Sequence, residues 1–564
     1  MATATPENKD SFATSGNADD KQSKAFVNDN EKGGIKTMPF ILLNEICEKL
    51  AMVGFSKNMV NYLTQQLHMP LTKAANTLTN FNGTSSLTPL LGAFIADSYA
   101  GKFWTITVST AIYLAGMIVL TLSAALPQLR PPPCAGDQVC QEANGSQMAV
   151  LYLSLLFAAL GSGGIRPCVA AFGAEQFVEE DPTQPKKTWV FFNWYYFALG
   201  VSILLASTVL VYIQDNVGWS WGLGIPTLAM ALSIIVFLIG YPLYRNLDPA
   251  GSPHTRVLQE LDASISTDGL LHHTKQLKFL DKAAIVTEED SLKSSEKPNF
   301  WRLNTVHRVE ELKSILRMLP IWAAGILFAT SNAQQNTFSL QQANTMERHL
   351  TKSFVIPSAS MSVFGMLSVL ITIVLYDRLL VRVARRITGL ERGINFLQRM
   401  AIGFFIAIIA TMVAGFVEVK RKHAASASGL IDSPESTIPI SVFWLVPQYS
   451  LHGIAEAFMV IGHLEFFYNQ APESMRSTAT ALFWTSISAG DYTSTLLVTL
   501  VHKYSDWLPN RNLNKGKLEY FYWLLTLLQA LNIVYYLICA KFYTFKPLSH
   551  KTEHVEGVEL TTQV

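Results

Sequence analysis

The chain has 564 residues, of which 49% are hydrophobic and only 15% are charged. Ordinary soluble domains carry about 25% charged residues, so this composition indicates an integral membrane protein. The net charge is +1 and no basic cluster is interleaved with aromatic residues, so nucleic acid is not an expected partner. The five cysteines are scattered without metal-ligand spacing, and the sequence therefore predicts no zinc site.

Residues 1–35 are polar and rich in Lys, Asp, Asn and Ser. They contain neither an apolar core nor a small-residue cleavage pattern, so we expect a disordered tail and not a signal peptide. The first apolar run, near 37–62, then acts as an uncleaved membrane anchor.

Five further apolar runs of spanning length follow, near 82–98, 103–126, 149–172, 189–213 and 221–244. The next segment, 245–308, is too long and too hydrophilic to cross a membrane. Six more apolar runs lie near 312–338, 354–376, 396–417, 441–467, 478–501 and 520–542. The sequence thus predicts twelve membrane-spanning helices, six on each side of a central linker.

The predicted fold class is therefore an all-α integral membrane protein with two six-helix halves. We expect a tail over residues 1–35, an N-terminal half over 36–245, a linker over 246–310, a C-terminal half over 311–544 and a second tail over 545–564.

Loop chemistry predicts the orientation of the chain in the membrane. The loop after the eighth helix carries Arg378, Arg382, Arg385, Arg386 and Arg392. Such basic density is typical of the cytoplasmic face, so both tails and the linker are expected to be cytoplasmic. Lys420, Arg421 and Lys422 then fall outside, against the rule. We keep the topology because loop bias is a summed tendency.

The loop between the third and fourth helices is extracellular in this topology. It contains the sequon Asn144-Gly145-Ser146, which makes Asn144 a candidate glycosylation site. Cys134 and Cys140 lie in the same loop and are able to form a disulfide, although nearby cysteines are often free.

Three ionisable residues interrupt the first apolar run. Glu45, Glu48 and Lys49 are spaced i, i+3 and i+4, which places them on one face of a helix within pairing distance. Ionisable groups at membrane depth are costly and usually line a bundle interior, so a proton site is the first hypothesis. A structural ion pair near a helix end is the alternative, and the pattern alone does not separate the two.

Two predicted cytoplasmic turns echo each other. The first covers residues 92–102 and contains Gly92, Asp97, Gly101 and Lys102. The second contains Asp377, which is followed by several arginines. In each turn a carboxylate at a helix end faces basic residues, so Asp97 and Lys102 form a candidate latch. The first turn resembles the loop signature of the major facilitator superfamily, whose two six-helix halves rock about a midplane site.

Longer motifs narrow this resemblance. The segment 83–97 reads GTSSLTPLLGAFIAD and resembles the signature of the proton-dependent oligopeptide transporter family. The segments 192–196 (FNWYY) and 465–477 (EFFYNQAPESMRS) are similar to its plant branch, the nitrate transporter and peptide transporter family. The resemblance covers about 34–547. Arg166, the segment 44–49 and the segment 336–342 resemble the third plant subfamily, which is associated with nitrite, nitrate and gibberellin-type hormones.

The resemblance implies roles for the charged residues. Glu45, Glu48 and Lys49 match the family's opening motif, which implies proton coupling. At the position of Arg166 most relatives have a lysine that pairs with a carboxylate of the tenth helix, here assigned to Glu465. Arginine keeps the attraction but does not lose its proton, so the predicted gate or substrate anchor switches through Glu465 or by separation.

The resemblance also bears on the substrate. Peptide-transporting relatives carry two tyrosines and an arginine where this chain has Met52, Val53 and Ser56, so peptide binding is disfavoured. Asn332 replaces a histidine of the dual-affinity nitrate transporter, and an amide supplies no positive charge. Arg166 remains as the anion partner. The remaining predicted cavity residues are Gln335, Asn336, Phe338 and Trp484. A small carboxylate with an apolar body suits this cavity as well as an inorganic ion does.

Four other residues carry weaker expectations. Thr105 matches a phosphorylation position of the dual-affinity nitrate transporter, which would add a regulatory kinase as partner. His452 and Glu456, at i and i+4, either extend a proton path or form a local pair. Asp491 lies within the eleventh helix, either facing the cavity or, as we expect, exposed to water near the outer end.

The predicted function is import of small anions with protons by alternating access, without a cofactor. The expected partners are a small anionic solute, protons and the lipid bilayer. The plasma membrane is the expected location, with an internal membrane such as the plastid envelope or vacuole as the alternative. A transporter of peptides or other metabolites and an anion sensor with little transport stay open. A membrane enzyme is the weakest alternative because the sequence shows no activated nucleophile, no set of metal ligands and no phosphate-binding loop.

Overall fold

The computed structural model describes residues 33–132, 141–176, 195, 198–245, 306–352, 354–389, 393–434, 436–470, 476–510 and 512–543. Both tails, most of the predicted linker, Cys134, Cys140, Arg392 and most of the segment 192–196 lie outside these ranges.

The N-terminal half consists of long antiparallel helices. They are α2 (Met38–Asn61), α3 (Leu71–Ile95), α4 (Gly101–Ala125), α5 (Gly145–Glu175), the span Ala198–Asn216 that ends in α7 (Val211–Asn216), and α8 (Trp219–Ile239). Short helical turns lie at Ile35–Thr37, Tyr62–Gln66, Ala96–Ala100, Pro127–Leu129, Ala206–Leu210 and Tyr241–Leu243.

The C-terminal half is built in the same way. It contains α11 (Val306–Asn332), α12 (Phe338–Thr345), α13 (Ser362–Leu375), α14 (Val381–Thr388), α15 (Phe396–Ala427), α16 (Val446–Gln470), α17 (Arg476–Tyr504) and α18 (Leu518–Phe542). Its short helical turns are η8 (Ala333–Asn336), Ser358–Met361, Tyr376–Leu380 and Val442–Leu445. Four short strands pair in its loops: β1 (Met346–Glu347) parallel to β4 (Ile438–Ser441), and β2 (His349–Thr351) antiparallel to β3 (Phe354–Val355).

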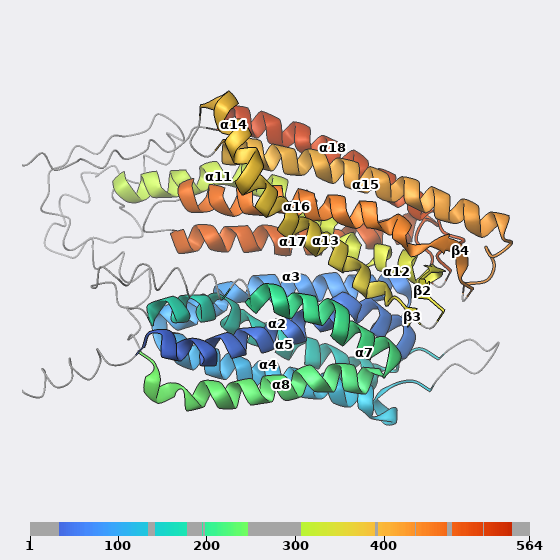
Figure 1. Ribbon diagram of the computed structural model, residues 1–564, viewed down its shortest axis with the longest axis horizontal. Helices are drawn as coiled ribbons and strands as arrows, with labels where there is room; N and C mark the ends of the chain where they lie inside the picture. The colour runs from blue at the N-terminus through green and yellow to red at the C-terminus, as the bar shows by residue number, and fades with distance from the viewer. Residues whose placement is uncertain are drawn as a thin grey trace, which may run out of the picture.

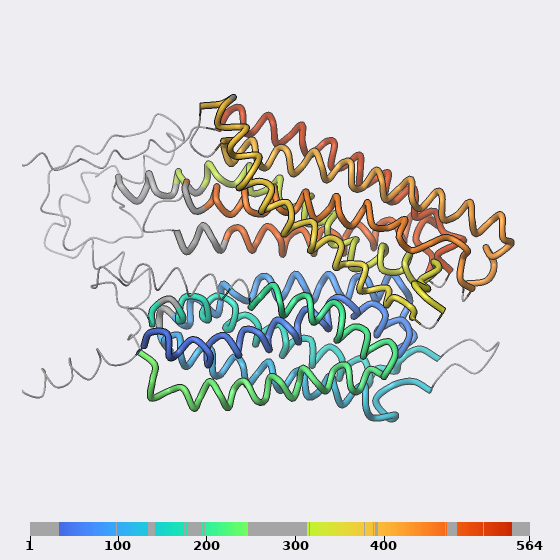
Figure 2. The backbone as a smooth tube through the Cα atoms, viewed as in Figure 1, coloured from blue at the N-terminus to red at the C-terminus, as the bar shows by residue number. Residues whose placement is uncertain are grey.

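The predicted twelve-helix fold is confirmed. The two halves lie side by side as separate helix bundles (Figure 1). Each bundle is one continuous stretch of sequence, blue to green and then yellow to red (Figure 2). Within the described residues, seven helical segments are long and apolar enough by composition to cross a membrane. The long helices that fall short of this criterion, α2, α3, α11, α16 and α17, carry most of the polar residues discussed below.

Three predicted helix boundaries need correction. The second helix begins at Leu71 and not near residue 82, because its polar outer part is hydrogen-bonded to α17 and not exposed to lipid. The ninth helix continues to Ala427, beyond the predicted end near 417, where its charges are paired. The seventh helix is interrupted by the turn η8, so α11 and α12 are separate segments.

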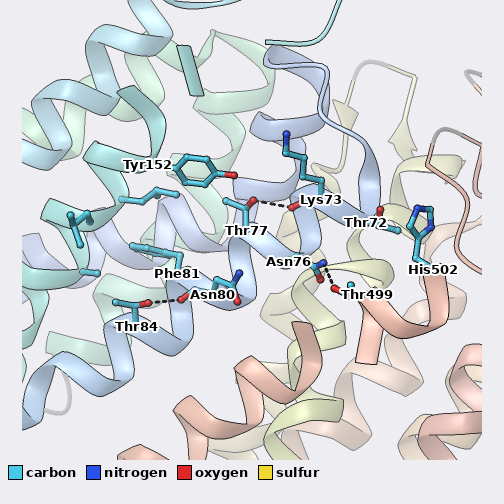
Figure 3. Close-up of a pocket in the computed structure, with 13 residues that line it drawn as sticks. Thr72, Lys73, Asn76, Thr77, Asn80, Phe81, Thr84, Tyr152, Thr499 and His502 are labelled. Atoms are coloured by element: carbon cyan, nitrogen blue, oxygen red, sulfur yellow. Dashed lines mark hydrogen bonds between the residues drawn. The ribbon is translucent and has the colours of Figure 1, made fainter. Parts of the chain in front are cut away.

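Hydrogen bonds between the halves gather toward one end of the molecule. This end carries β2, β3 and β4 in Figure 1, and loop chemistry assigns it to the outside; we call it the outer end. Among the described residues these bonds are Lys57 to Asn336, Asn61 to Ser358, Gln341 and Asn344 to Asn61, Leu71 and Thr72 to Asn510, Asn76 to Thr499, Thr79 and Asn80 to Thr495, Thr84 to Tyr492 and Ser488 to Gly83. The bond of Asn76 to Thr499 is visible in Figure 3. The described contacts therefore hold the two halves together at the outer end.

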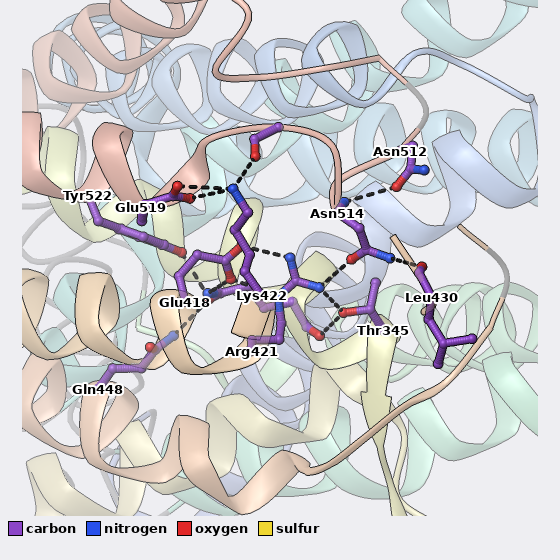
Figure 4. A network of polar contacts seen from close by, with 12 residues as sticks. Thr345, Glu418, Arg421, Lys422, Leu430, Gln448, Asn512, Asn514, Glu519 and Tyr522 are labelled. Atoms are coloured by element: carbon purple, nitrogen blue, oxygen red, sulfur yellow. Dashed lines mark hydrogen bonds and ion pairs between the residues drawn. The ribbon is translucent and has the colours of Figure 1, made fainter. Parts of the chain in front are cut away.

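A buried polar network explains the three outer cations that oppose the loop rule. The Arg421 side chain is fully buried, and its Nε and Nη2 atoms each lie 2.7 Å from a carboxylate oxygen of Glu418 (Figure 4). The ammonium of Lys422 lies 3.0 Å from Glu519, and that of Lys420 lies 3.2 Å from the centre of the Trp444 ring. These cations are held by the fold and are not free loop charges, so they do not count against the predicted topology.

Replacing Arg421 by methionine is expected to lower the apparent Tm of the purified protein sharply. The substitution leaves the Glu418 carboxylate buried without its cation, and breaking a buried pair typically costs about 3–5 kcal/mol. Thermal unfolding in detergent measures the effect. The double variant Glu418→Gln/Arg421→Met is expected to be more stable than the single one; equal Tm values would show that lost packing, not charge, is responsible.

Candidate functional site

Four charged side chains form a cluster inside the N-terminal half. Glu45 and Glu48, which are 1% and 0% exposed, lie on α2 with Lys49. The Lys49 ammonium is 3.2 Å from Glu45 Oε1 and 2.6 Å from Glu48 Oε2. Arg166 of α5 joins the cluster, with its Nε 3.5 Å from Glu48 Oε1. The predicted face of α2 and Arg166 of α5 thus form a compact set of two carboxylates and two cations.

The two carboxylates have different surroundings. Glu48 faces both Lys49 and Arg166, whereas Glu45 faces Lys49 and accepts a hydrogen bond of 3.0 Å from the Tyr195 hydroxyl. The second oxygen of Glu45, Oε2, is buried and has no hydrogen-bond partner, whereas Glu48 Oε1, which also accepts no hydrogen bond, lies 3.5 Å from the Arg166 guanidinium. Since a buried carboxylate oxygen without a donor is poorly stabilised as an anion, Glu45 Oε2 is the natural place for a proton.

Close packing of α5 on α3 places Arg166. A Cβ atom on Gly92 would lie 2.2 Å from the carbonyl oxygen of Gly163, so glycine is required at this crossing. Arg166 Nη1 donates to the carbonyl oxygen of Ser85 at 3.3 Å, and Nη2 contacts the sulfur of Met52. Position 52, one of those predicted to disfavour peptides, therefore lies directly beside the cation.

The predicted pair of Arg166 with Glu465 is wrong for this conformation. Glu465 instead lies 3.8 Å from Arg399, a residue of its own half, and the Arg399 guanidinium covers the Tyr376 ring at 4.1 Å. The physical reason is the rotational position of Glu465 on its helix. Glu456 interacts with Lys57 of the N-terminal half. Glu465 follows Glu456 by nine residues, which is about 180° of rotation around α16, so Glu465 faces away from the N-terminal half. Glu465 and Glu456 therefore point to opposite sides of their helix.

Glu465→Gln is accordingly expected to leave the apparent KM of substrate uptake within about twofold of the wild-type value, since its ion pair with Arg399 lies within the C-terminal half and apart from the charged cluster. Arg166→Ala is expected to raise KM, because it removes a cation from the charged cluster. Uptake kinetics of the two variants at equal surface expression give the comparison. Equal increases of KM would restore Glu465 as a partner of the substrate.

Lys57 was not among the predicted site residues, and Glu456 was predicted only together with His452; the two interact electrostatically where the halves join. The Lys57 ammonium on α2 donates to Asn336 Oδ1 at 3.0 Å. The same ammonium attracts the carboxylate of Glu456 on α16 electrostatically. A lysine inside an apolar run was the sequence signal for this pair. The predicted local hydrogen bond of His452 with Glu456 is not among the described contacts, and His452 Nδ1 is buried without a partner.

The broken seventh helix supplies polar groups to this junction. Gln335 in η8 is only 7% exposed, and neither its amide oxygen nor its amide nitrogen has a partner. Its backbone oxygen accepts a hydrogen bond of 3.2 Å from the Tyr449 hydroxyl of α16. Asn332, one turn earlier, is half-buried. An unpaired buried amide is costly, so Gln335 is suited to meet a ligand.

One of the predicted cavity residues, Phe338, lies in the core, whereas the role of Trp484 stays a prediction. The Phe338 side chain is fully buried and packs against Phe521 at 5.5 Å between ring centres, so it belongs to the hydrophobic core and does not line a cavity. Trp484 is 36% exposed and lies edge-on to the buried Phe483. The expectation that Asp491 is exposed to water is also wrong: it is 7% exposed and lies close to Gly83 of α3.

The remaining predicted residues lie near the ends of the helices. The Asp97 side chain is outside the described residues, and Lys102 pairs with Glu175 of α5. The Thr105 side chain is buried and donates to the Gly101 carbonyl at 2.9 Å, so a kinase would need the start of α4 to open. Asn144 is exposed, and its Oδ1 accepts from the Gln147 amide at the start of α5.

The arrangement offers proton and anion binding but no evident enzyme chemistry. Within the described ranges, no group of three or more His, Cys, Asp or Glu side chains is placed to hold a metal ion. Among the described cysteines, Cys47 and Cys539 are free thiols.

Comparison with known proteins agrees with this picture. A family model described as the POT family matches residues 103–513. Protein NRT1/PTR family 3.1 of Arabidopsis thaliana is 63% identical, covering 97% of this chain and 98% of the relative. Protein NRT1/PTR family 8.1 of the same plant is 45% identical over 96% and 99% of the two chains. The predicted third subfamily is thus supported.

Solved structures give the same fold. The crystal structure of an auto-inhibited POT family peptide transporter is similar with a TM-score of 0.69, at 21% identity, over 91% of this chain and 98% of that one. A second POT family transporter structure, PepTSo, is similar with a TM-score of 0.65. Given the extent of the family match and the highly identical plant relative, this chain belongs to the POT family in its NRT1/PTR branch, and is a proton-coupled membrane transporter and not an enzyme.

Proposed function

We propose that this transporter imports small anions together with protons by alternating access. The observation that supports it most is the buried cluster of Glu45, Glu48, Lys49 and Arg166. Such a group is costly at membrane depth, and ionisable residues that persist there usually lie on proton or substrate paths.

The cluster couples the two solutes through its net charge. With both carboxylates ionised, two negative and two positive charges cancel. Glu45 has one cationic neighbour where Glu48 has two, so Glu45 takes up the proton at the lower cost. Its protonation leaves one net positive charge, which favours an anion beside Arg166. Binding of the proton therefore strengthens binding of the anion.

The junction at the outer side of the cluster suits a small anion. Lys57 supplies a third cation nine residues beyond Glu48, about 13 Å along α2. The unpaired Gln335 amide and the partnerless Nδ1 of His452 add neutral polar contacts on neighbouring elements. Met52, which contacts Arg166, has no hydroxyl group with which to bind a peptide backbone, and this disfavours peptides as substrates. These groups fit nitrate, nitrite or a small carboxylate hormone such as a gibberellin.

Competitive uptake tests the proposal. Cells that express the protein are offered nitrate, nitrite, a gibberellin, abscisic acid and a dipeptide at pH 5.5, with Arg166→Ala as the variant. We expect anion uptake to depend on the inward proton gradient, with an inward current only when more than one proton enters with each monovalent anion, since each net charge moved at −100 mV is worth about 2.3 kcal/mol. Tracer uptake that is unchanged when the proton gradient is collapsed would contradict proton symport, and preferential dipeptide uptake would contradict the anion substrate.

Two controls address the rival expectations. A sensor binds the anion without flux, so tracer accumulation separates it from a transporter. We propose that the protein lies in the plasma membrane. An epitope tag inserted in the loop near Asn144 is then labelled on intact cells, whereas a protein in an internal membrane is not labelled.

A further inference from the structure

A cavity of about 430 Å³ opens on the side of the molecule where α3 meets α17 (Figure 3). α3 packs against both α5 and α17, and residues of all three helices line the cavity. Since α3 belongs to the N-terminal half and α17 to the C-terminal half, the cavity lies beside the seam between the halves. We call it the α3 groove.

The outer mouth of the α3 groove carries the positive charge of one lysine. Lys73 lies in the first turn of α3 and is exposed, and His502 lies in the last turn of α17. His502 Nδ1 is 2.8 Å from the Leu508 carbonyl oxygen, which orients the ring, and Nε2 donates to an anion only when the imidazole is protonated. The lining contains no carboxylate, and Lys73 enters none of the ion pairs of the described residues. An anionic group is therefore favoured at this mouth.

Amide groups follow at the next turns of α3. Asn76 donates to Thr499 at 2.9 Å, but its Oδ1 is buried without a partner. Asn80 is exposed; its Oδ1 accepts from Thr495 at 2.8 Å, and its amide nitrogen has no partner in the described part of the chain. Water is absent from the hydrocarbon region, so amide groups facing lipid need a polar ligand.

The α5 wall of the groove is apolar. Tyr152 and Leu156 are 47% and 48% exposed, and Leu155 and Ala159 lie behind them. Exposed large apolar side chains on a spanning helix face hydrocarbon, so this wall is suited to an acyl chain and not to a soluble ligand.

We propose that the α3 groove binds one glycerophospholipid from the outer leaflet. The phosphate lies between Lys73 and His502, an ester carbonyl accepts from the Asn80 amide, and one acyl chain lies along Tyr152 and Leu156. Lys73 and Asn80 are seven residues apart, about 10 Å along the helix, so the cationic, amide and apolar groups follow the order of a lipid that enters from the interface.

The position of this lipid gives it influence over transport. It covers the hydrogen bonds of Asn76 and Asn80 to α17, and these bonds join the two halves. Alternating access requires the halves to move against each other, so a lipid along this seam stabilises the conformation in which the seam is closed.

Native mass spectrometry of the purified transporter titrated with phosphatidylglycerol tests the proposal. The wild type is expected to retain a bound lipid, and Lys73→Glu is expected to reduce retention at least fivefold. Lys503→Glu is the matched control, because Lys503 is an exposed lysine of α17 that does not line the groove. Its lipid retention is expected to equal that of the wild type.

Three outcomes would overturn the lipid site: equal loss of lipid in both variants, equal retention of an uncharged diacylglycerol, or displacement of the lipid by glycerol phosphate at the same concentration. The last result would assign the mouth to a soluble anion. Substrate uptake by Lys73→Glu in proteoliposomes is measured in parallel, so failure of the lipid site is distinguishable from failure of anion transport.

Discussion

Accumulation of substrate against its gradient is expected to disappear when Glu45 is replaced by glutamine, while exchange of substrate continues. The amide has the shape and charge of the protonated carboxylate, so the variant stays in the loaded form of the cluster. Lys49 keeps its contact of 2.6 Å with Glu48, which preserves the fold around α2. A proton gradient of one pH unit is worth about 1.4 kcal/mol per proton, so the variant loses about tenfold accumulation per unit.

The measurement compares pH-driven uptake with counterflow in proteoliposomes. Counterflow needs only substrate binding and movement of the halves, so it is expected to stay near the wild-type rate in Glu45→Gln. Glu48→Gln is the comparison variant: it removes the partner of both Lys49 and Arg166 and is expected to impair counterflow as well. Normal pH-driven accumulation by Glu45→Gln would exclude Glu45 as the coupling group.

Replacement of Lys57 by methionine is expected to raise the apparent KM for the anion by about tenfold, which corresponds to about 1.4 kcal/mol. The variant loses the hydrogen bond of 3.0 Å to Asn336 and the cation that faces Glu456. Both the proposed anion site and a contact between the halves are weakened. Uptake kinetics at pH 5.5 give KM, with surface expression measured in the same cells.

A double-mutant cycle separates the two effects of Lys57. If Lys57 and Glu456 act as a pair, the effects of Lys57→Met and Glu456→Gln on counterflow are non-additive, with a coupling energy of about 0.5–3 kcal/mol. The Glu465→Gln variant is the matched control on the opposite face of α16. Full additivity would mean that Lys57 and Glu456 act independently across the junction.

Hydropathy predicted the twelve spans because the bilayer demands long apolar segments whatever their neighbours are. The hydropathy prediction of helix boundaries was wrong where polar side chains form hydrogen bonds or ion pairs inside the protein. The outer part of α3 contains Lys73, Asn76 and Asn80, which lower the mean hydropathy of this stretch. The prediction therefore left it out of the second helix, although residues of α17 form hydrogen bonds with the two asparagine amides. The end of α15 was missed for the same reason, since Arg421 is neutralised by Glu418.

The sequence by itself determined the fold class, the family and the charged face of α2, because residues spaced i, i+3 and i+4 share a face on any helix. Only the tertiary structure decided which charges meet. Arg166 contacts Glu48, and Lys57 lies opposite Glu456. These pairings depend on how each helix is rotated and where it crosses its neighbour, and a shift of two and a half turns along α16 was enough to exchange Glu456 for Glu465. Helical phase is local and visible in sequence, whereas the partner across the bundle is set by packing.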